Sequence, residues 1–380
     1  MLLPCADRDT GPGARAWFLA AILLLAFGAA TGSAAAQCPG QRWVGVAGSD
    51  AANDCSNYDT PCATVNQAVR SACAGETVYL QGPKQGSTTR ATYNQDVVID
   101  RPVTVQAEKG HNCLDTTISG TGGADVVTIV ASGATLADLQ ITGAPAHACV
   151  RVGDPGHPNV RGVQVLSGWV TGCGIGVVVD STGTGDRNYI NSVKVDGMVA
   201  SGIPDGGSGI LVTGYNDRLL ILGIFPPQVT ADAVPRGNDG SGVVVRAGAT
   251  GQDVRLVGSV VRGSGANPAA PGHAAIEVHA TGNAPVLAME GNEIDGRLFD
   301  ADGLPSRAAP SNEVAVLVDG AHVDAHCDNI HDNAAGVVVQ NGGSASIGVA
   351  VFSRQGGTAL QVDSSSSDAA AMSQFTGNGP

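Results

Sequence analysis

Three ionisable side chains of complementary chemistry occupy the same place in successive repeats of this 380-residue chain. Arg246, His279 and Asp319 each follow a short apolar segment, and Glu277 lies two residues before the histidine. A guanidinium binds a carboxylate through two parallel hydrogen bonds, whereas an imidazole exchanges protons near neutral pH. We therefore predict a catalytic site in which Arg246 holds an anionic group of a substrate and His279 transfers the proton. Asp319 would orient the histidine, and Glu277 would be the reserve base.

A second interpretation of these four residues is a solvated polar edge on the outside of stacked strands. Inserted segments help to decide between the catalytic site and the solvated edge. These insertions comprise residues 200–208, 224–241, 262–274 and 295–313, and each precedes a repeated strand. Insertions at one corner of successive repeats form a wall that commonly carries binding. The last three insertions precede the strands of the predicted site, which favours the catalytic interpretation.

The element that positions these residues is a repeated phrase: a small residue, an apolar one, any residue, and a second apolar one. Its eight copies begin at Cys149, Gly176, Gly209, Gly242, Ala275, Ala315, Gly336 and Ala359. Alternation puts the apolar pair on one face of a strand, and stacked coils would bury these pairs in a continuous core. We predict an all-β fold, a single-stranded right-handed parallel β-helix. An antiparallel sandwich would need hairpins without a fixed period.

A second phrase precedes the first in several coils, as in Val163, Val165, Ser167 and Val170, and predicts a second strand in each coil. Its small residue marks a bend into the next strand. Cys327 holds that place in a later coil, so we predict that its thiol is buried and unpaired, as a small apolar filler.

The middle residue of the repeated phrase points outward, and the resulting column is mostly apolar. It runs through Arg151, Val178, Leu211, Val244, Glu277, Leu317, Val338 and Gln361. An exposed apolar stripe of this length implies a cover, by inserted loops, a tail or another subunit. A homo-oligomer is therefore one of the assemblies to consider.

Two groups of side chains suggest a metal ion. The inserted segments contain five aspartates that could hold Ca²⁺ through oxygen ligands, namely Asp232, Asp239, Asp295, Asp300 and Asp302. Acidic loops without an EF-hand pattern are more often simply solvated. A second group alternates along one strand, which predicts that all its members face outward: His322, Asp324, His326 and Asp328. Its two histidines would lie about 13 Å apart, so one ion cannot bridge them. We expect no cofactor, with Ca²⁺ as the alternative.

The ends of the chain differ from the repeats. Residues 1–36 are predicted to be a signal peptide, with an apolar core from Trp17 to Ala30 and cleavage before Gln37. A membrane anchor is the weaker alternative, because the apolar run is shorter than the roughly 20 residues of a span. No later segment is long and apolar enough for a membrane span, so we expect a secreted or periplasmic protein.

The remaining chain divides into three predicted parts. Residues 37–125 would form an N-terminal cap and the first coils, 126–365 the β-helix coils, and 366–380 a C-terminal tail. An amphipathic helix from Ala63 to Arg70 is expected to cover the open end of the first coil.

The amino-acid composition indicates which compartment and which partners to expect. Eight cysteines follow the predicted signal peptide, and their even number predicts disulfides, most of them near the N-terminal end. The formal net charge of -14 argues against a nucleic-acid partner, because phosphate binding needs clustered lysine and arginine. Aromatic residues make up only 4% of the chain, which argues against an extended carbohydrate groove.

The N-terminal part resembles that of pectate-lyase-like β-helix proteins. The resemblance rests on Asp54-Cys55, on Pro61 to Thr64 and the helix that follows, on Gly75 to Leu80, and on Tyr93 to Val98. It implies the parallel β-helix fold and an exported protein that binds or modifies an extracellular polysaccharide.

The catalytic motifs of that superfamily's known enzymes are absent from the sequence, so no catalytic residue is carried over. If the chain is an enzyme, the resemblance implies a polysaccharide lyase or a glycoside hydrolase. The alternative is a non-enzymatic surface or scaffold protein.

Overall fold

The computed structural model describes most of the chain after the predicted signal peptide. The described residues are 38, 40–84, 89–111, 115–181, 188–199, 202–213, 219–222, 238–246, 253–262, 274–280, 286–297, 313–371 and 374–376. Contacts divide the chain into a unit of residues 1–38 and a unit of residues 39–380, and the second contains the described strands.

A twelve-stranded parallel sheet holds the first strand of each coil. In spatial order its strands are β1 (Gln41–Val44), β2 (Thr77–Leu80), β5 (Thr104–Ala107), β8 (Thr135–Ala137), β11 (Gln164–Leu166), β14 (Asn188–Asn191), β17 (Leu219–Leu222), β19 (Asp253–Val257), β22 (Val286–Glu290), β25 (His322–His326), β28 (Ser344–Gly348) and β31 (Ser367–Ala371).

A ten-stranded parallel sheet holds the last strand of each coil, and it contains the repeated phrase. Its strands are β4 (Val97–Ile99), β7 (Val127–Ile129), β10 (Ala148–Val152), β13 (Ile175–Val179), β16 (Ile210–Val212), β18 (Val243–Arg246), β21 (Ala274–His279), β24 (Val314–Asp319), β27 (Ala335–Gln340) and β30 (Leu360–Val362).

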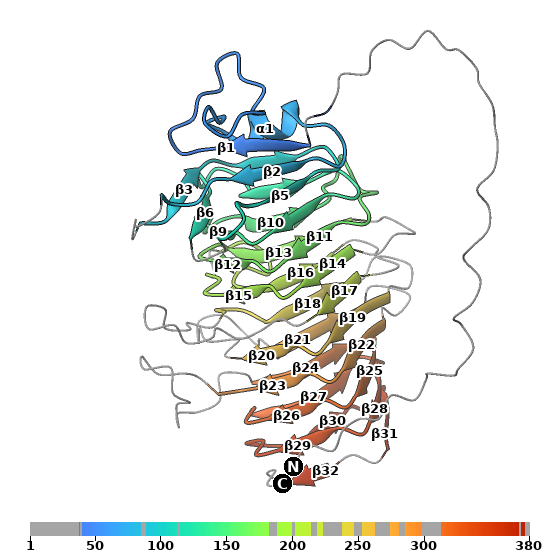
Figure 1. Ribbon diagram of the computed structural model, residues 1–380. Coiled ribbons are helices and arrows are strands. Elements are labelled where there is room, and N and C mark those ends of the chain that lie inside the picture. Colours follow the sequence, from blue (N-terminus) through green and yellow to red (C-terminus); the bar gives the residue numbers. More distant parts are fainter. Residues whose placement is uncertain are drawn as a thin grey trace, which may run out of the picture. The chain divides into compact units, whose positions relative to one another are not determined.

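Two five-stranded parallel sheets lie between these strands in the chain order. The N-terminal one contains β3 (Ala91–Asn94), β6 (Thr116–Ser119), β9 (Gln140–Thr142), β12 (Trp169–Thr171) and β15 (Lys194–Asp196). The C-terminal one contains β20 (Val260–Arg262), β23 (Glu293–Asp295), β26 (Asn329–His331), β29 (Val351–Ser353) and β32 (Gln374–Thr376). The strands stack in sequence order along the coils (Figure 1).

Valine and isoleucine side chains fill the space between the sheets. The first apolar residue of the repeated phrase is at most 3% exposed in seven successive strands, at Val150, Val177, Ile210, Val243, Ile276, Val316 and Val337. Branched side chains suit this place because they pack well on a pleated surface. The predicted all-β parallel β-helix is confirmed. The last strands, β31 and β32, fall within the expected tail and pair with β28 and β29, so the coils continue past residue 366.

A residue in the left-handed conformation ends most strands of the twelve-stranded sheet. Asp138, Ser167, Gly258, Gly291 and Cys327 hold this place, with φ between 49° and 65°. The left-handed turn breaks the alternation, so the following residue points inward, as the burial of Leu139, Ser259, Asn292 and Asp328 shows. The prediction that Cys327 is a buried, unpaired filler is therefore wrong. Its side chain is half-buried and its sulfur is disulfide-bonded.

Helix α1 (Val65–Ser71) lies where the amphipathic helix was expected. Thr64 caps it by accepting a hydrogen bond from the Gln67 N–H at 3.2 Å. Its buried side contains Val65, Ala68 and Val69 and contacts β1, β2 and β4. Its role as a cover for the first coil stays a prediction.

Disulfides are present, as the cysteine count predicted. Cys55 is bonded to Cys62 near the N-terminal end, and Cys149 to Cys173 in the middle of the coils. Cys38 and Cys73 are disulfide-bonded as well, while Cys113 lies outside the described residues. In the described part of the chain, no helix is long and apolar enough to cross a membrane.

Candidate functional site

Adjacent strands bring the predicted site residues into one row. β18, β21 and β24 pair in parallel, and the pairing sets Arg246 opposite His279 and His279 opposite Asp319. Neighbouring strands are about 4.8 Å apart, so these side chains lie within reach of each other on the outer face of the ten-stranded sheet. The predicted alignment of the three coils is correct.

His279 lies between two carboxylates. Its Nε2 atom is 2.9 Å from an oxygen of Glu277, and its Nδ1 atom is 3.2 Å from an oxygen of Asp319. The hydrogen bond to Glu277, with a smaller contribution from Asp319, raises the pKa of His279 above its usual value. Because both ring nitrogens face acceptors, the protonated imidazole, which has two donors, fits this place best.

Glu277 is held from the protein side as well. Its side chain is almost fully buried, and its other oxygen accepts a hydrogen bond from the Ser241 hydroxyl at 2.6 Å and from the Ala274 N–H at 3.2 Å. Asp319 accepts a hydrogen bond from the Asn341 amide at 2.5 Å. Ser241 and Asn341 were not singled out in the sequence, since isolated polar residues beside a strand carry no distinctive pattern.

Arg246 is engaged by a residue that the sequence did not connect with it. Its guanidinium donates two hydrogen bonds to the Asp205 carboxylate, one of them 2.9 Å long, and this pairing raises the pKa of Arg246. Asp205 belongs to the inserted segment 200–208. In the described structure, Arg246 therefore anchors that segment beside the row of site residues.

The same segment covers part of the outward apolar column. Ile203 packs against a small cluster of buried residues on the outer face of the ten-stranded sheet, namely Ala148, Ile175, Val178, Leu211 and Val244. Along these coils, the outward apolar column is therefore covered by an inserted loop of the same chain, which was one of the three predicted covers. Glu277 follows Val244 in the column, so the polar site begins where the apolar cluster ends.

Replacing Arg246 by alanine is expected to loosen the segment 202–208 without unfolding the coils. The ion pair is partly exposed, so its loss should cost less than about 1 kcal/mol of global stability. Hydrogen exchange of this segment should become faster in the variant, with unchanged protection of β18 and β21. Unchanged exchange throughout the segment would show that the ion pair does not hold it.

A second cluster of charges lies on the C-terminal five-stranded sheet. Glu293, Asp295 and His331 place their ligand atoms within 4.8 Å of one another, a spacing that could suit a metal ion. Fully buried Asp295, however, already pairs with Arg297 at 2.6 Å and with Arg262 at 3.3 Å. Two guanidinium groups supply the positive charge that an ion would bring, so this cluster is best explained as an internal ion-pair network.

Asp295, one of the five aspartates considered for Ca²⁺, ends a strand and pairs with two arginines, and calcium binding there stays a prediction. Asp239 lies on a described segment, while Asp232, Asp300 and Asp302 lie outside the described residues.

The four alternating residues of β25 and its turn do not face one way. His322 contacts Asp324 at 3.2 Å and the Ser344 hydroxyl at 2.7 Å on the outer face. The prediction that Asp328 faces outward is wrong: it is 1% exposed, because left-handed Cys327 reverses the alternation. In the described part of the chain the four residues form no common group of ligand atoms.

Fold and site together define a right-handed parallel β-helix protein with a histidine–carboxylate cluster on the outer face of its ten-stranded sheet. No protein-family model matches the sequence, and no curated protein is significantly similar to it in sequence.

Solved structures share the fold. The chain is similar to pectate lyase Pel9A, with 12% identity, a TM-score of 0.55, and coverage of 85% of this chain and 78% of the lyase. It is similar to an alginate lyase from Paenibacillus sp. strain FPU-7, with 15% identity, a TM-score of 0.50, and coverage of 82% and 96%. A third similar structure is ORF18 of Geobacillus virus E2, with 12% identity and a TM-score of 0.55. The match covers 82% of this chain but spans only 57% of the viral protein. At such identities the likeness shows the fold alone.

Proposed function

We propose that this chain is an exported β-helix protein that binds an extracellular polysaccharide on the outer face of its ten-stranded sheet and modifies it there by proton transfer. The arrangement of Glu277, His279 and Asp319 carries the proposal, because a protonated imidazole between two carboxylates can both donate and recover a proton. His279 is assigned the proton transfer, Asp319 its orientation, and Glu277 the role of reserve base. Arg246 is assigned to the edge of the site, where Asp205 holds it.

The row of polar side chains continues beyond His279 along the stack. Asp319 lies opposite Gln340 on the next strand, and Asn341 donates both to Asp319, through its side chain, and to Asp363, through its backbone N–H. A polymer lying along the coils would meet a polar group on each successive strand, about 4.8 Å apart. Sugars offer hydroxyl groups that such carboxylates and amides can bind.

Export is supported by the disulfides, which persist in oxidising compartments. Together with the predicted signal peptide they favour a secreted or periplasmic protein. Two of the similar structures are polysaccharide lyases by name, which supports a lyase or a hydrolase as the class of enzyme.

The second candidate is a non-enzymatic surface or scaffold protein. One observation favours it: both nitrogens of His279 and the guanidinium of Arg246 are already satisfied by carboxylates of the same chain. Side chains whose hydrogen bonds are all made within the chain can have a purely structural role in stabilising the coils.

The purified mature chain should be assayed on a panel of neutral and uronate-containing polysaccharides. Both reactions release new reducing ends, so reducing ends without unsaturated products indicate hydrolysis, and reducing ends together with unsaturated products indicate a lyase. Turnover of one glycan class is the expected result. Binding without turnover would support the scaffold alternative, and neither binding nor turnover on the whole panel would refute the proposal.

A further inference from the structure

A cavity of about 530 Å³ lies near the N-terminal end of the twelve-stranded sheet, away from the row of His279 in the chain order. Polar side chains form much of its lining: Asp59, Gln81, Lys84, Glu108 and His111, beside the ring of Tyr58. Its volume is within the range of about 300–1,000 Å³ that small-molecule sites occupy. None of these residues stands out in the sequence, because they come from three separate segments.

The tyrosine that lines this cavity belongs to a cluster of three aromatic rings, although aromatic residues are scarce in the chain. The ring of Trp43 on β1 stacks on that of Tyr79 on β2, with 5.0 Å between the centroids. The ring of Tyr58 meets Trp43 edge to face at 4.8 Å and lines the cavity. Tyr58 is 48% exposed, whereas Tyr79 is 6% exposed, so the cluster presents one open ring on a buried support.

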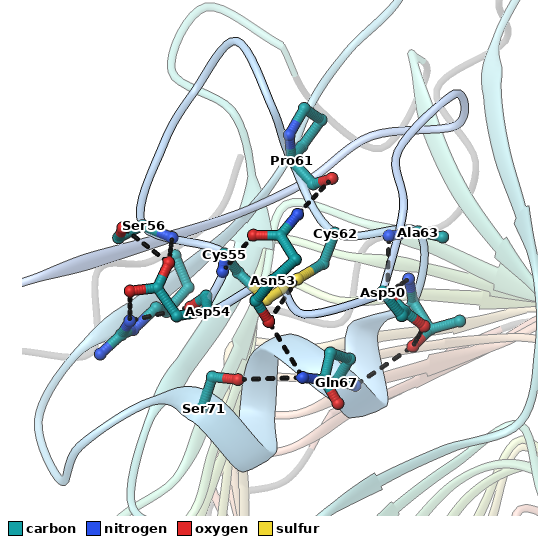
Figure 2. The surroundings of a disulfide bond; sticks show 12 residues. Asp50, Asn53, Asp54, Cys55, Ser56, Pro61, Cys62, Ala63, Gln67 and Ser71 are labelled. Atoms are coloured by element: carbon teal, nitrogen blue, oxygen red, sulfur yellow. Dashed lines mark hydrogen bonds and ion pairs between the residues drawn. A yellow bond between two sulfur atoms is a disulfide. The ribbon is translucent and has the colours of Figure 1, made fainter.

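The chain holds the loop of Tyr58 in place from both ends. The Cys55–Cys62 disulfide closes the loop, and the Asn53 amide accepts from the Cys55 N–H at 2.8 Å and donates to the Pro61 carbonyl at 3.0 Å (Figure 2). Gln81 donates to the Tyr58 carbonyl at 2.7 Å. A loop fixed in this way loses little conformational freedom when a ligand binds.

The polar lining is arranged around the same opening. Glu108 lines the cavity beside Tyr58, and its carboxylate raises the pKa of the Tyr58 phenol. The His111 ring lies directly over Gly82, where a Cβ atom would come within 2.2 Å of it, so the absence of a side chain at Gly82 makes room for the imidazole. Carboxylate, amide and ammonium groups thus surround one exposed aromatic face.

We propose that this cavity binds a neutral saccharide unit, which stacks the apolar face of its ring on Tyr58 and places its hydroxyls against Gln81, Lys84 and Glu108. An aromatic ring offers an apolar face, and the mixed donors and acceptors match hydroxyl groups. Asp59 and Glu108 disfavour a polyuronate through like-charge repulsion. This site is distinct from the cluster of His279 and does not depend on catalysis there.

Binding of neutral oligosaccharides, with cello-, xylo-, manno- and malto-hexaose as probes, should be followed by calorimetry and by tryptophan fluorescence. Trp43 touches Tyr58, so its emission should change on saturation. Replacing Tyr58 by alanine should weaken binding about ten-fold or more, while Tyr58→Phe, which keeps the ring, should retain most of it. Tyr58 is an exposed loop residue, and circular dichroism checks that the variants fold.

A matched control separates this site from others. Tyr189→Ala removes a half-buried tyrosine of the same sheet outside the cavity, and this variant should bind the oligosaccharides as the unchanged protein does. In a His279→Ala background, Tyr58→Ala should weaken binding by the same factor, because the two sites are independent. Loss of polysaccharide turnover in His279→Ala with an undiminished effect of Tyr58→Ala on binding would leave this proposal standing. No saturable binding of any probe, or equal affinity of Tyr58→Ala and the unchanged protein, would overturn it.

Discussion

Replacing Asp328 by asparagine is expected to stabilise the protein above pH 7 and to remove most of the pH dependence of its stability between about pH 4 and 7. Asp328 is 1% exposed, and burial raises its pKa to about 7. One of its carboxylate oxygens, Oδ2, has no hydrogen-bond partner among the described residues. The folded protein keeps this carboxyl group protonated up to about pH 7, whereas the unfolded chain ionises it near pH 3.8. The contribution of the group to the free energy of unfolding is therefore fully present below pH 3.8 and is lost as the pH rises through about 7.

The neighbouring coil shows why asparagine suits this place. Asn292 occupies the equivalent position and donates its amide to the Leu256 carbonyl at 2.9 Å, while Asp328 Oδ1 accepts from both the backbone N–H and the amide of Asn292. Met289 lies opposite Leu256 in the register, so its carbonyl is placed to accept from an amide introduced at position 328. The substitution keeps the acceptor and gives the unpaired atom a partner.

Urea unfolding of both proteins at pH 4.5, 6 and 8 measures the effect. The gain in unfolding free energy at pH 8 should be on the order of 2–4 kcal/mol, from a pKa difference of about three units. Asp324→Asn is the matched control, because that carboxylate lies on the outer face of β25, the strand that precedes Asp328, and should change little. Parallel pH profiles of Asp328→Asn and the unchanged protein would contradict the assignment.

Replacing His279 by alanine is expected to lower kcat on the polysaccharide substrate by a factor of about 10²–10⁴, the usual contribution of a proton-transferring side chain. The protonated form is the active acid, and its raised pKa keeps it charged at neutral pH. Activity should therefore fall only as the pH rises through that raised value. Glu277→Gln should move this alkaline limb to lower pH, because the hydrogen bond to Glu277 is the main cause of the shift.

The pH dependence of kcat in the three proteins distinguishes a catalytic histidine from a structural one. His322→Ala is the matched control, since this histidine also contacts a carboxylate, Asp324, but lies on another sheet. It should retain full activity. Equal losses in both histidine variants, or an unmoved alkaline limb in Glu277→Gln, would place the chemistry elsewhere.

Periodicity made part of the site predictable. The repeated phrase aligns Val243 with Ile276 and Ile276 with Val316, and counting onward from these residues sets Arg246, His279 and Asp319 in one row. A one-residue slip would turn the valines outward and the charges into the core, so burial specifies the register strongly.

What the sequence by itself determined is therefore the fold, the stacking of its coils and the alignment of polar residues on its strands, because all three follow from which side chains must avoid water. The tertiary structure decided the partners that come from irregular segments. Asp205 reaches Arg246 across 41 residues, the loop of Tyr58 folds over Trp43, and a left-handed turn at Cys327 sends Asp328 into the core. Turns and inserted loops have no period, and their course depends on contacts between segments far apart in the chain, so no local pattern reveals them.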